Sequence, residues 1–260
     1  MRRAVCFLIA TLLPQMAFAQ VQPHRAEYSL RLGPAANAPR IGTAVQDLTL
    51  DCTGWRLKRD ISSEIALTAS WKLSVGSKLD GEETLRGGAF RYRAVQIQNG
   101  AERETRGKVA RAGEEMRVEI VSPAGPAQFA LPSPTLLPVA ALEHMIERLR
   151  SGAGAFPALA FDAEVINDAF LVDITETERA TLRAGRHADG PVVAPGGKSW
   201  PVFMTFTRGR QQDQRPLFSV SALVYEAGIL DRLTVDTGLV SVTADLKSLQ
   251  MHKAPVCPRS

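Results

Sequence analysis

Residues 240–246 read Val-Ser-Val-Thr-Ala-Asp-Leu, so apolar side chains alternate with polar ones. The same period of two is found in residues 26–32, 115–120 and 218–224. Because successive side chains of a β-strand point to opposite faces, each stretch is predicted to be a strand with one apolar and one wet face. Sheets with one wet face are antiparallel. The sequence therefore predicts a mainly β protein with an antiparallel sheet.

Further strands are expected between clear turn signals. We predict them at residues 45–50, 55–67, 69–79, 89–98, 103–111, 169–177 and 200–208. The turn signals are Asp80-Gly81, Gly87-Gly88, Asn99-Gly100, Ala112-Gly113 and Ala227-Gly228. The Pro-rich stretch 123–134 and the Gly-, Pro- and Ala-rich stretch 185–197 are predicted to be loops.

One stretch has the period of a helix. Apolar residues recur there at spacings of three, four and three, namely Val139, Leu142, Ile146 and Leu149. Pro138 suits a first helical turn and Gly152 suits a stop, which predicts a helix over 138–151. Many strands and one helix fit either a sandwich or a long antiparallel sheet that curls into an open barrel around the helix.

The N-terminus has the features of an export signal. Arg2 and Arg3 precede the apolar run 4–13, and Ala17-Phe18-Ala19 is a small-x-small cleavage site. Residues 1–19 are therefore predicted to be a signal peptide, with cleavage near Ala19 and a mature chain from about Gln20. No apolar run reaches the roughly 18–20 residues of a spanning helix, so we expect a protein that does not span the membrane.

The charge balance argues against a nucleic-acid partner. The chain has 31 Lys and Arg against 27 Asp and Glu, and removal of Arg2 and Arg3 leaves a net charge of +2. Only 6% of the residues are aromatic, too few for a base-stacking surface. We therefore expect no nucleic-acid binding.

Two cysteines, Cys52 and Cys257, remain after the signal peptide. An even number of cysteines in an oxidising compartment indicates a disulfide. The bond would close a loop of 205 residues. The chain-entropy model gives about 5 kcal/mol for such a loop, as an upper figure. Because the bond would join residues near both ends of the mature chain, residues 20–260 are predicted to form one domain.

No catalytic set of residues can be recognised. Asp236-Thr237-Gly238 resembles an aspartic protease turn, but that chemistry needs two carboxylates and the chain has one copy. A hairpin turn is the better interpretation. His144 and Glu147 are one helical turn apart, and a solvated histidine is a better interpretation than a metal ligand. We expect no catalytic residue, no metal site and no cofactor.

Two further groups of side chains are candidates for binding surfaces. Trp55 and Trp71 could line a ligand groove, although core packing beside the disulfide is favoured. Arginines crowd the central strands at positions 91, 93, 103, 106, 111 and 117. They fit a face for anionic lipid or an acidic partner. Interspersed glutamates favour a solvated outer face instead.

Several motifs, in this order, resemble the envelope integrity protein B family of exported proteins. They are Asp51-Cys52-Thr53-Gly54-Trp55, residues 131–138 (Leu-Pro-Ser-Pro-Thr-Leu-Leu-Pro), Phe161-Asp162, Tyr225-Glu226-Ala227-Gly228-Ile229, residues 233–238 (Leu-Thr-Val-Asp-Thr-Gly) and Cys257. Ala163, Ala227 and Thr237 depart from the family pattern, which puts only local turns in doubt. The resemblance covers nearly the whole mature chain.

The resemblance implies a single periplasmic β-spiral domain, related in shape to periplasmic lipoprotein carriers, with a Cys52–Cys257 disulfide and one helix. It implies a non-enzymatic role in maintaining the cell envelope. The partners expected are envelope proteins, with a lipid or lipoprotein acyl chain on the concave face of the sheet as the alternative.

Overall fold

The computed structural model describes residues 21–35, 37–66, 72–179, 182, 195–209 and 215–257. Within them the chain forms one 15-stranded sheet. The strands are β1 (His24–Leu32), β2 (Arg40–Leu50), β3 (Gly54–Ala66), β4 (Lys72–Thr84), β5 (Ala89–Gln98), β6 (Ala101–Ala112), β7 (Glu115–Ser122), β8 (Gly125–Leu131), β9 (Thr135–Leu136), β10 (Ala155–Asp162), β11 (Asp168–Glu176), β12 (Ser199–Arg208), β13 (Phe218–Tyr225), β14 (Leu230–Asp236) and β15 (Ser241–Met251).

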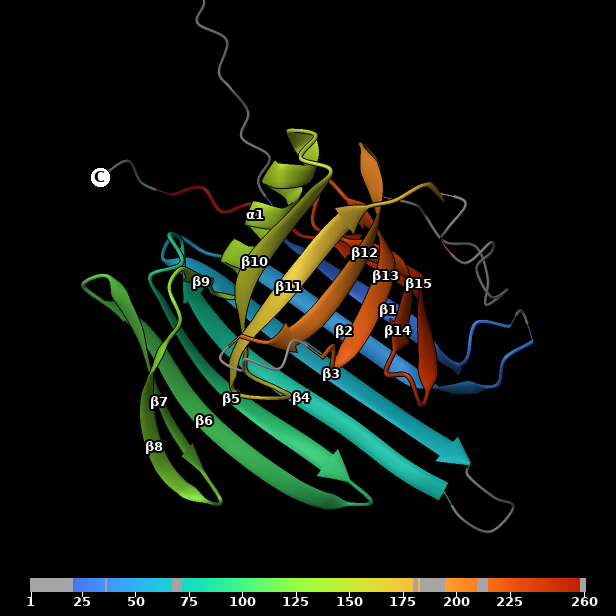
Figure 1. Ribbon diagram of the computed structural model, residues 1–260, viewed down its shortest axis with the longest axis horizontal. Coiled ribbons are helices and arrows are strands. Elements are labelled where there is room, and N and C mark those ends of the chain that lie inside the picture. The colour runs from blue at the N-terminus through green and yellow to red at the C-terminus, as the bar shows by residue number, and fades with distance from the viewer. Residues whose placement is uncertain are drawn as a thin grey trace, which may run out of the picture.

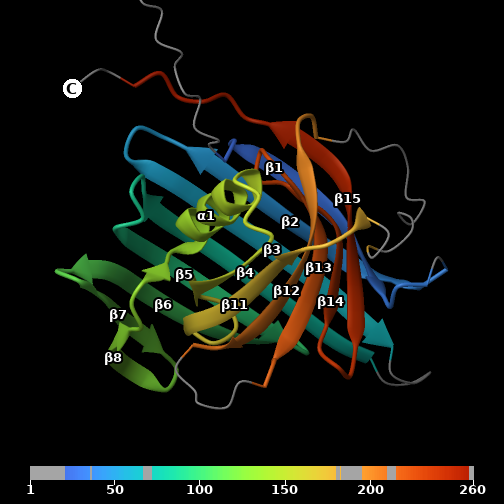
Figure 2. The same ribbon diagram turned by 45° about the horizontal axis from the view of Figure 1, so that its top comes forward.

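The sheet curls into a nearly closed, barrel-like layer around a helix, α1 (Pro138–Arg150) (Figures 1 and 2). The strand order is β8-β7-β6-β5-β4-β3-β2-β1-β15-β14-β13-β12-β11-β10-β9. Neighbouring strands are antiparallel except β9 and β10, which are parallel. This confirms the predicted antiparallel curled sheet around one helix and excludes the sandwich.

The core lies between the inner face of the sheet and α1. On β3, Trp55 and Leu57 are buried while Arg56 and Lys58 are exposed, which is the predicted alternation. From the helix, Ile146 and three neighbours on its buried side face the same cluster: Val139, Met145 and Leu149. Burial of each large aliphatic side chain contributes roughly 1.5–3 kcal/mol, so this contact holds the helix inside the curl.

Two glycines let aromatic rings cross from one strand to the next on the inner face. A Cβ on Gly81 would lie 2.5 Å from the ring of Phe90, and a Cβ on Gly107 would lie 2.3 Å from the ring of Tyr92. The two rings stack with their centroids 5.4 Å apart. Any side chain at Gly81 or Gly107 would displace these rings from the core.

A loop between β10 and β11 closes the inner side of the long strands. Glu164 lies on this loop and is buried, and its Oε1 accepts a hydrogen bond from Ser77 Oγ at 2.7 Å. Its Oε2 pairs with Arg59. Nearby, Tyr92 Oη donates to Asn167 Oδ1 at 2.9 Å. Polar contacts therefore join β3–β5 to the loop on the opposite wall of the curl.

Two sequence predictions about this sheet are wrong. Residues 123–134 are not a continuous loop, because they contain β8, which pairs with β7 from Met116–Leu131 to Ser122–Gly125. Asp80-Gly81 is not a turn, because β4 runs through it to Thr84. The close contact with Phe90 explains why a glycine is needed inside this strand.

Other predictions fall partly or wholly outside the described residues. The signal peptide, residues 1–19, lies outside them, as does most of the predicted loop 185–197. In the part that the structure describes, α1 is the helix, and no helix is long and apolar enough to cross a membrane.

Candidate functional site

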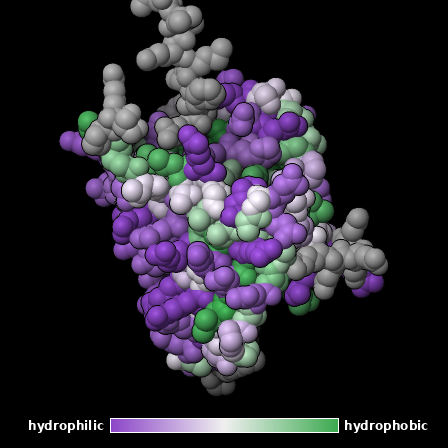
Figure 3. All heavy atoms as spheres, turned by 90° about the vertical axis from the view of Figure 1, so that its left-hand side faces the viewer, coloured by the Kyte–Doolittle hydropathy of each residue, from purple (hydrophilic) through white to green (hydrophobic). Residues whose placement is uncertain are grey.

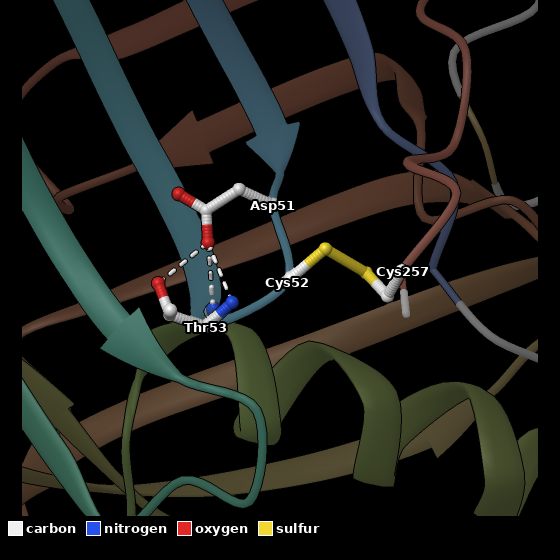
Figure 4. The surroundings of a disulfide bond; sticks show 5 residues. Asp51, Cys52, Thr53 and Cys257 are labelled. Carbon is white, nitrogen blue, oxygen red and sulfur yellow. Dashed lines mark hydrogen bonds between the residues drawn. A yellow bond between two sulfur atoms is a disulfide. The ribbon is translucent and has the colours of Figure 1, made fainter. Parts of the chain in front are cut away.

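A disulfide joins the turn after β2 to the C-terminal segment (Figure 4). Cys52 and Cys257 have their Cα atoms 5.5 Å apart, a normal separation for bonded cysteines, and are 205 residues apart in sequence. The C-terminal segment has a second attachment, since His252 Nε2 lies 2.8 Å from Asp47 Oδ1 and its backbone N–H donates to the Pro23 carbonyl. The disulfide thus fixes the end of the chain to the turn that begins β3.

Asp51 shapes that turn. Its Oδ1 accepts hydrogen bonds from Thr53 Oγ1 at 2.6 Å, Thr53 N–H at 2.7 Å and Gly54 N–H at 3.0 Å (Figure 4). These bonds, with a smaller contribution from the Arg56 charge, lower the pKa of Asp51 to about 2. Asp51 therefore stays ionised and places Cys52 opposite Cys257.

Of the two tryptophans predicted to pack beside the disulfide or line a groove, the structure describes one. Trp55 is 2% exposed and belongs to the core cluster. It also borders a surface cleft of about 190 Å³ together with Asp51, Thr53 and Gly54. Trp71 lies outside the described residues.

Glu83 is a buried carboxylate at the start of α1. The residue that caps the helix, Leu137, has no side chain able to accept a hydrogen bond. Glu83 on β4 replaces it: Oε2 accepts from Val139 N–H at 2.7 Å and Oε1 from Ala140 N–H at 2.9 Å. Burial raises the pKa of Glu83 to about 7, against the opposing effect of these two bonds.

The residues weighed as catalytic or metal-binding candidates have ordinary structural roles. Asp236 lies in the β14–β15 turn, where its Oδ1 accepts from Gly238 N–H at 2.7 Å, as a hairpin turn requires. His144 on α1 lies edge-on to Phe156, with ring centroids 6.2 Å apart. Among the described residues, no three His, Cys, Asp or Glu side chains gather as a metal site would require.

Two hollows that share lining residues lie along β3–β8, and another of about 360 Å³ lies along β1–β5. The cleft beside Trp55 is lined on its charged side by Arg56, Glu82, Arg91 and Lys108. A wider groove of about 800 Å³ shares Glu82, Arg91 and Lys108 and continues over β7 and β8. Figure 3 shows the side of the molecule that carries β7 and β8, where hydrophilic residues cover much of the surface and hydrophobic residues lie in patches between them.

Local sequence patterns do not reveal Glu83 or the joint position of Arg91 and Lys108. A signal for Glu83 was present, because Leu79, Gly81 and Glu83 share one face of a strand and only Glu83 is charged. Its helix partners are 56 and 57 residues away, which no local pattern reveals. The sequence shows the arginines, but their register with Lys108 depends on the β5–β6 pairing.

Comparisons with known proteins agree with this geometry. The family model described as EipB-like matches residues 15–253. A solved structure described as a beta-barrel-like protein of domain of unknown function DUF1849, from Brucella abortus, is 19% identical, with a TM-score of 0.75 over 90% of this chain and 99% of that chain. No curated protein matches. On the extent of the family match, this chain belongs to the EipB-like family.

Proposed function

We propose that this protein works in the periplasm without catalysis and supports the integrity of the cell envelope by binding protein partners. The observation that carries the proposal is the filled interior. Side chains of the sheet and of α1, among them Phe90, Phe161 and Ile146, pack together in the space between them. The outer face of the sheet is then the large surface available for contact.

The use of buried acids also supports a role without catalysis. Glu83 binds the start of α1, Glu164 binds Arg59 and Ser77, and Asp231 Oδ1 accepts from Leu246 N–H at 3.0 Å. Each of these carboxylates has a partner that holds two elements together. Acid–base catalysis needs instead a carboxyl or imidazole that faces a substrate site.

Carriage of a lipid or acyl chain gets no support from this interior. A carrier needs an apolar cavity able to enclose most of its ligand. The hollows along β1–β8 described above are open and lined by several charged side chains. Native mass spectrometry of the purified mature protein is therefore expected to show the mass of the polypeptide alone. Co-purified lipid would instead support the carrier hypothesis.

The proposed role in the cell envelope and the proposed location are tested in the source bacterium. Deletion of the gene is expected to sensitise cells to detergent, and the full chain should restore resistance. The Asp236→Asn variant should restore it equally well, whereas its failure would favour the protease interpretation. N-terminal sequencing of the protein from the periplasmic fraction should begin near Gln20, and recovery of the uncleaved chain from the cytoplasm would refute the proposed location.

A further inference from the structure

Four basic side chains form what we call the basic block on the outer face of β5 and β6: Arg91, Arg93, Arg106 and Lys108. They are exposed and alternate with the buried residues of both strands. In the β5–β6 register, Arg91 lies opposite Lys108 and Arg93 lies opposite Arg106. Like charges directly opposite each other destabilise a sheet, so the basic block works against folding.

The two pairs of the basic block differ in their partners. Glu104 lies 2.6 Å from both Arg93 and Arg106, and the hydrogen bonds from these arginines lower its pKa to about 2. Arg91 and Lys108 have no such bridge within the part of the chain that the structure describes. Two further acids lie opposite this pair in the register: Glu82 faces Arg91 and pairs with Arg56 at 3.4 Å, and Glu119 faces Lys108.

The Arg91–Lys108 pair, which shares no bridging acid, lies where the two hollows meet. Arg91 and Lys108 line both the cleft beside Trp55 and the groove over β7 and β8. An anionic group bound in either hollow would therefore reach both cations. Two adjacent positive charges without a bridging acid are suited to a carboxylate, because a charge-assisted hydrogen bond is roughly twice as strong as a neutral one.

The far side of the groove, on β7 and β8, has exposed apolar side chains next to Glu119 and Gln128. Val121 is 60% exposed and lies opposite Arg106 in the register, and Pro126 faces Val121 from β8. Ala127 is exposed beside them and lines the same groove. The groove therefore places the cations of β5 and β6 next to exposed apolar side chains of β7 and β8.

We infer that this groove docks an extended acidic segment of a protein partner, with its carboxylates on Arg91 and Lys108 and its apolar side chains on Val121 and Pro126. The inference rests on the proposed function and gives that function a location. An anionic membrane surface fits less well, because Asp80, Glu82 and Glu119 lie in the same groove and would repel it. A peptide segment can place its charges over the cations alone.

The test uses the mature protein and synthetic extended peptides. The probe is Glu-Val-Glu-Val-Glu-Val-Glu with blocked ends, compared with the same peptide carrying Gln for Glu, and binding is followed by fluorescence anisotropy. We expect binding of the Glu peptide that weakens with added salt. We expect the Arg91→Gln/Lys108→Gln double variant to bind about tenfold more weakly. Equal binding by wild type and double variant, or no binding by wild type, overturns the inference.

A matched variant separates this site from general charge. Lys247 on β15 and Lys253 just after it are exposed. The Lys247→Gln/Lys253→Gln variant therefore removes the same number of positive charges from another part of the surface. It should bind the Glu peptide as wild type does. The Arg91→Gln/Lys108→Gln protein should melt at the same temperature as wild type or higher, because a repulsive pair is gone. Equal loss of binding in both double variants overturns the inference.

Two further measurements distinguish the other occupants. The first is co-sedimentation with phosphatidylglycerol vesicles. If the wild-type protein co-sediments and Arg91→Gln/Lys108→Gln does not, the groove binds a membrane surface, and the inference that it docks a peptide segment is overturned. A photo-crosslinking residue at Val121 should capture defined periplasmic proteins, and one at Leu239, which is 95% exposed on the β14–β15 turn, should not. Capture from Leu239 but not from Val121 overturns this inference and leaves the proposed function standing.

Discussion

Asp51 and Glu83 have the same structural role in two different surroundings. Each carboxylate accepts hydrogen bonds from backbone N–H groups where the chain starts a new element: β3 after Asp51 and α1 beside Glu83. Their pKa values move in opposite directions, to about 2 for Asp51 and to about 7 for Glu83. Hydrogen bonding favours the ionised form in both places, so another effect must reverse the sign at Glu83.

That effect is burial. Asp51 lies in an exposed turn, where water solvates the charge and the hydrogen bonds add to its stability. Glu83 is 3% exposed, and removal of its charge from water outweighs two good hydrogen bonds and the favourable end of the helix dipole. The comparison shows that burial, against the effect of the cap hydrogen bonds, sets the protonation preference of a carboxyl group on the inner face of this sheet.

The largest effect is expected when the disulfide, the other restraint on the Asp51 turn, is removed. Cys52→Ser should lower the free energy of unfolding by up to about 5 kcal/mol, because a 205-residue loop is no longer closed in the unfolded chain. Urea unfolding without reductant measures it. With reductant, wild type and variant should unfold alike, and a difference that persists there would mean that the serine hydroxyl harms packing instead.

The next largest effect is expected when Glu83, the buried side chain that caps α1, is removed. Glu83→Ala should cost about 2–3 kcal/mol at pH 5, because the N–H groups of Val139 and Ala140 lose their acceptor in a buried place. The exposed neighbour provides the control: Glu82→Ala loses only a surface pair with Arg56 and should stay within about 0.5 kcal/mol of wild type. Equal losses in the two variants would deny that Glu83 caps α1.

The pH dependence tests the direction of the Glu83 shift. A folded pKa raised from 4.5 to about 7 means that the native state holds a proton that the unfolded chain has released. The contribution is therefore complete below pH 4.5 and is lost as the pH rises through 7, on the order of 3 kcal/mol. Glu83→Gln should lack this slope between pH 4.5 and 7.5, and parallel curves for the two proteins would contradict the assignment.

The smallest effect is expected at the exposed carboxylate. Asp51→Ala should lower the melting temperature at pH 7 less than Glu83→Ala does at pH 5, because water can replace Asp51 as the acceptor for Thr53 and Gly54. The folded pKa of Asp51 is depressed from 3.8 to about 2, so its contribution should be complete above pH 3.8 and be lost as the pH falls through 2. A larger loss than for Glu83→Ala would reverse the comparison.

The sequence predicts most of the fold and little of the geometry at its surface. Alternation predicts strands such as residues 218–224, which lie within β13, because one face of each is buried. It misses β8, whose short run includes Pro126 and three alanine or glycine neighbours, so that no alternation is visible. It also ends β4 too early, because the ring that covers Gly81 comes from the next strand.

The candidate site divides in the same way. Cysteine number and the predicted compartment are enough to pair Cys52 with Cys257. Glu83 and the Arg91–Lys108 pair depend on contacts between residues far apart in the chain or on different strands, and only the register of the sheet reveals them. Such contacts carry no local signature, so single-sequence patterns cannot find them.

The place of β1 affects what happens to an incomplete chain. The first strand in the sequence lies inside the sheet, between β2 and β15. A product that stops before Ser241 would lack β15 and leave one side of β1 with bare backbone donors and acceptors. Such an edge recruits other chains, so a premature stop codon near the end of the gene would produce an aggregation-prone polypeptide and not merely a shorter one.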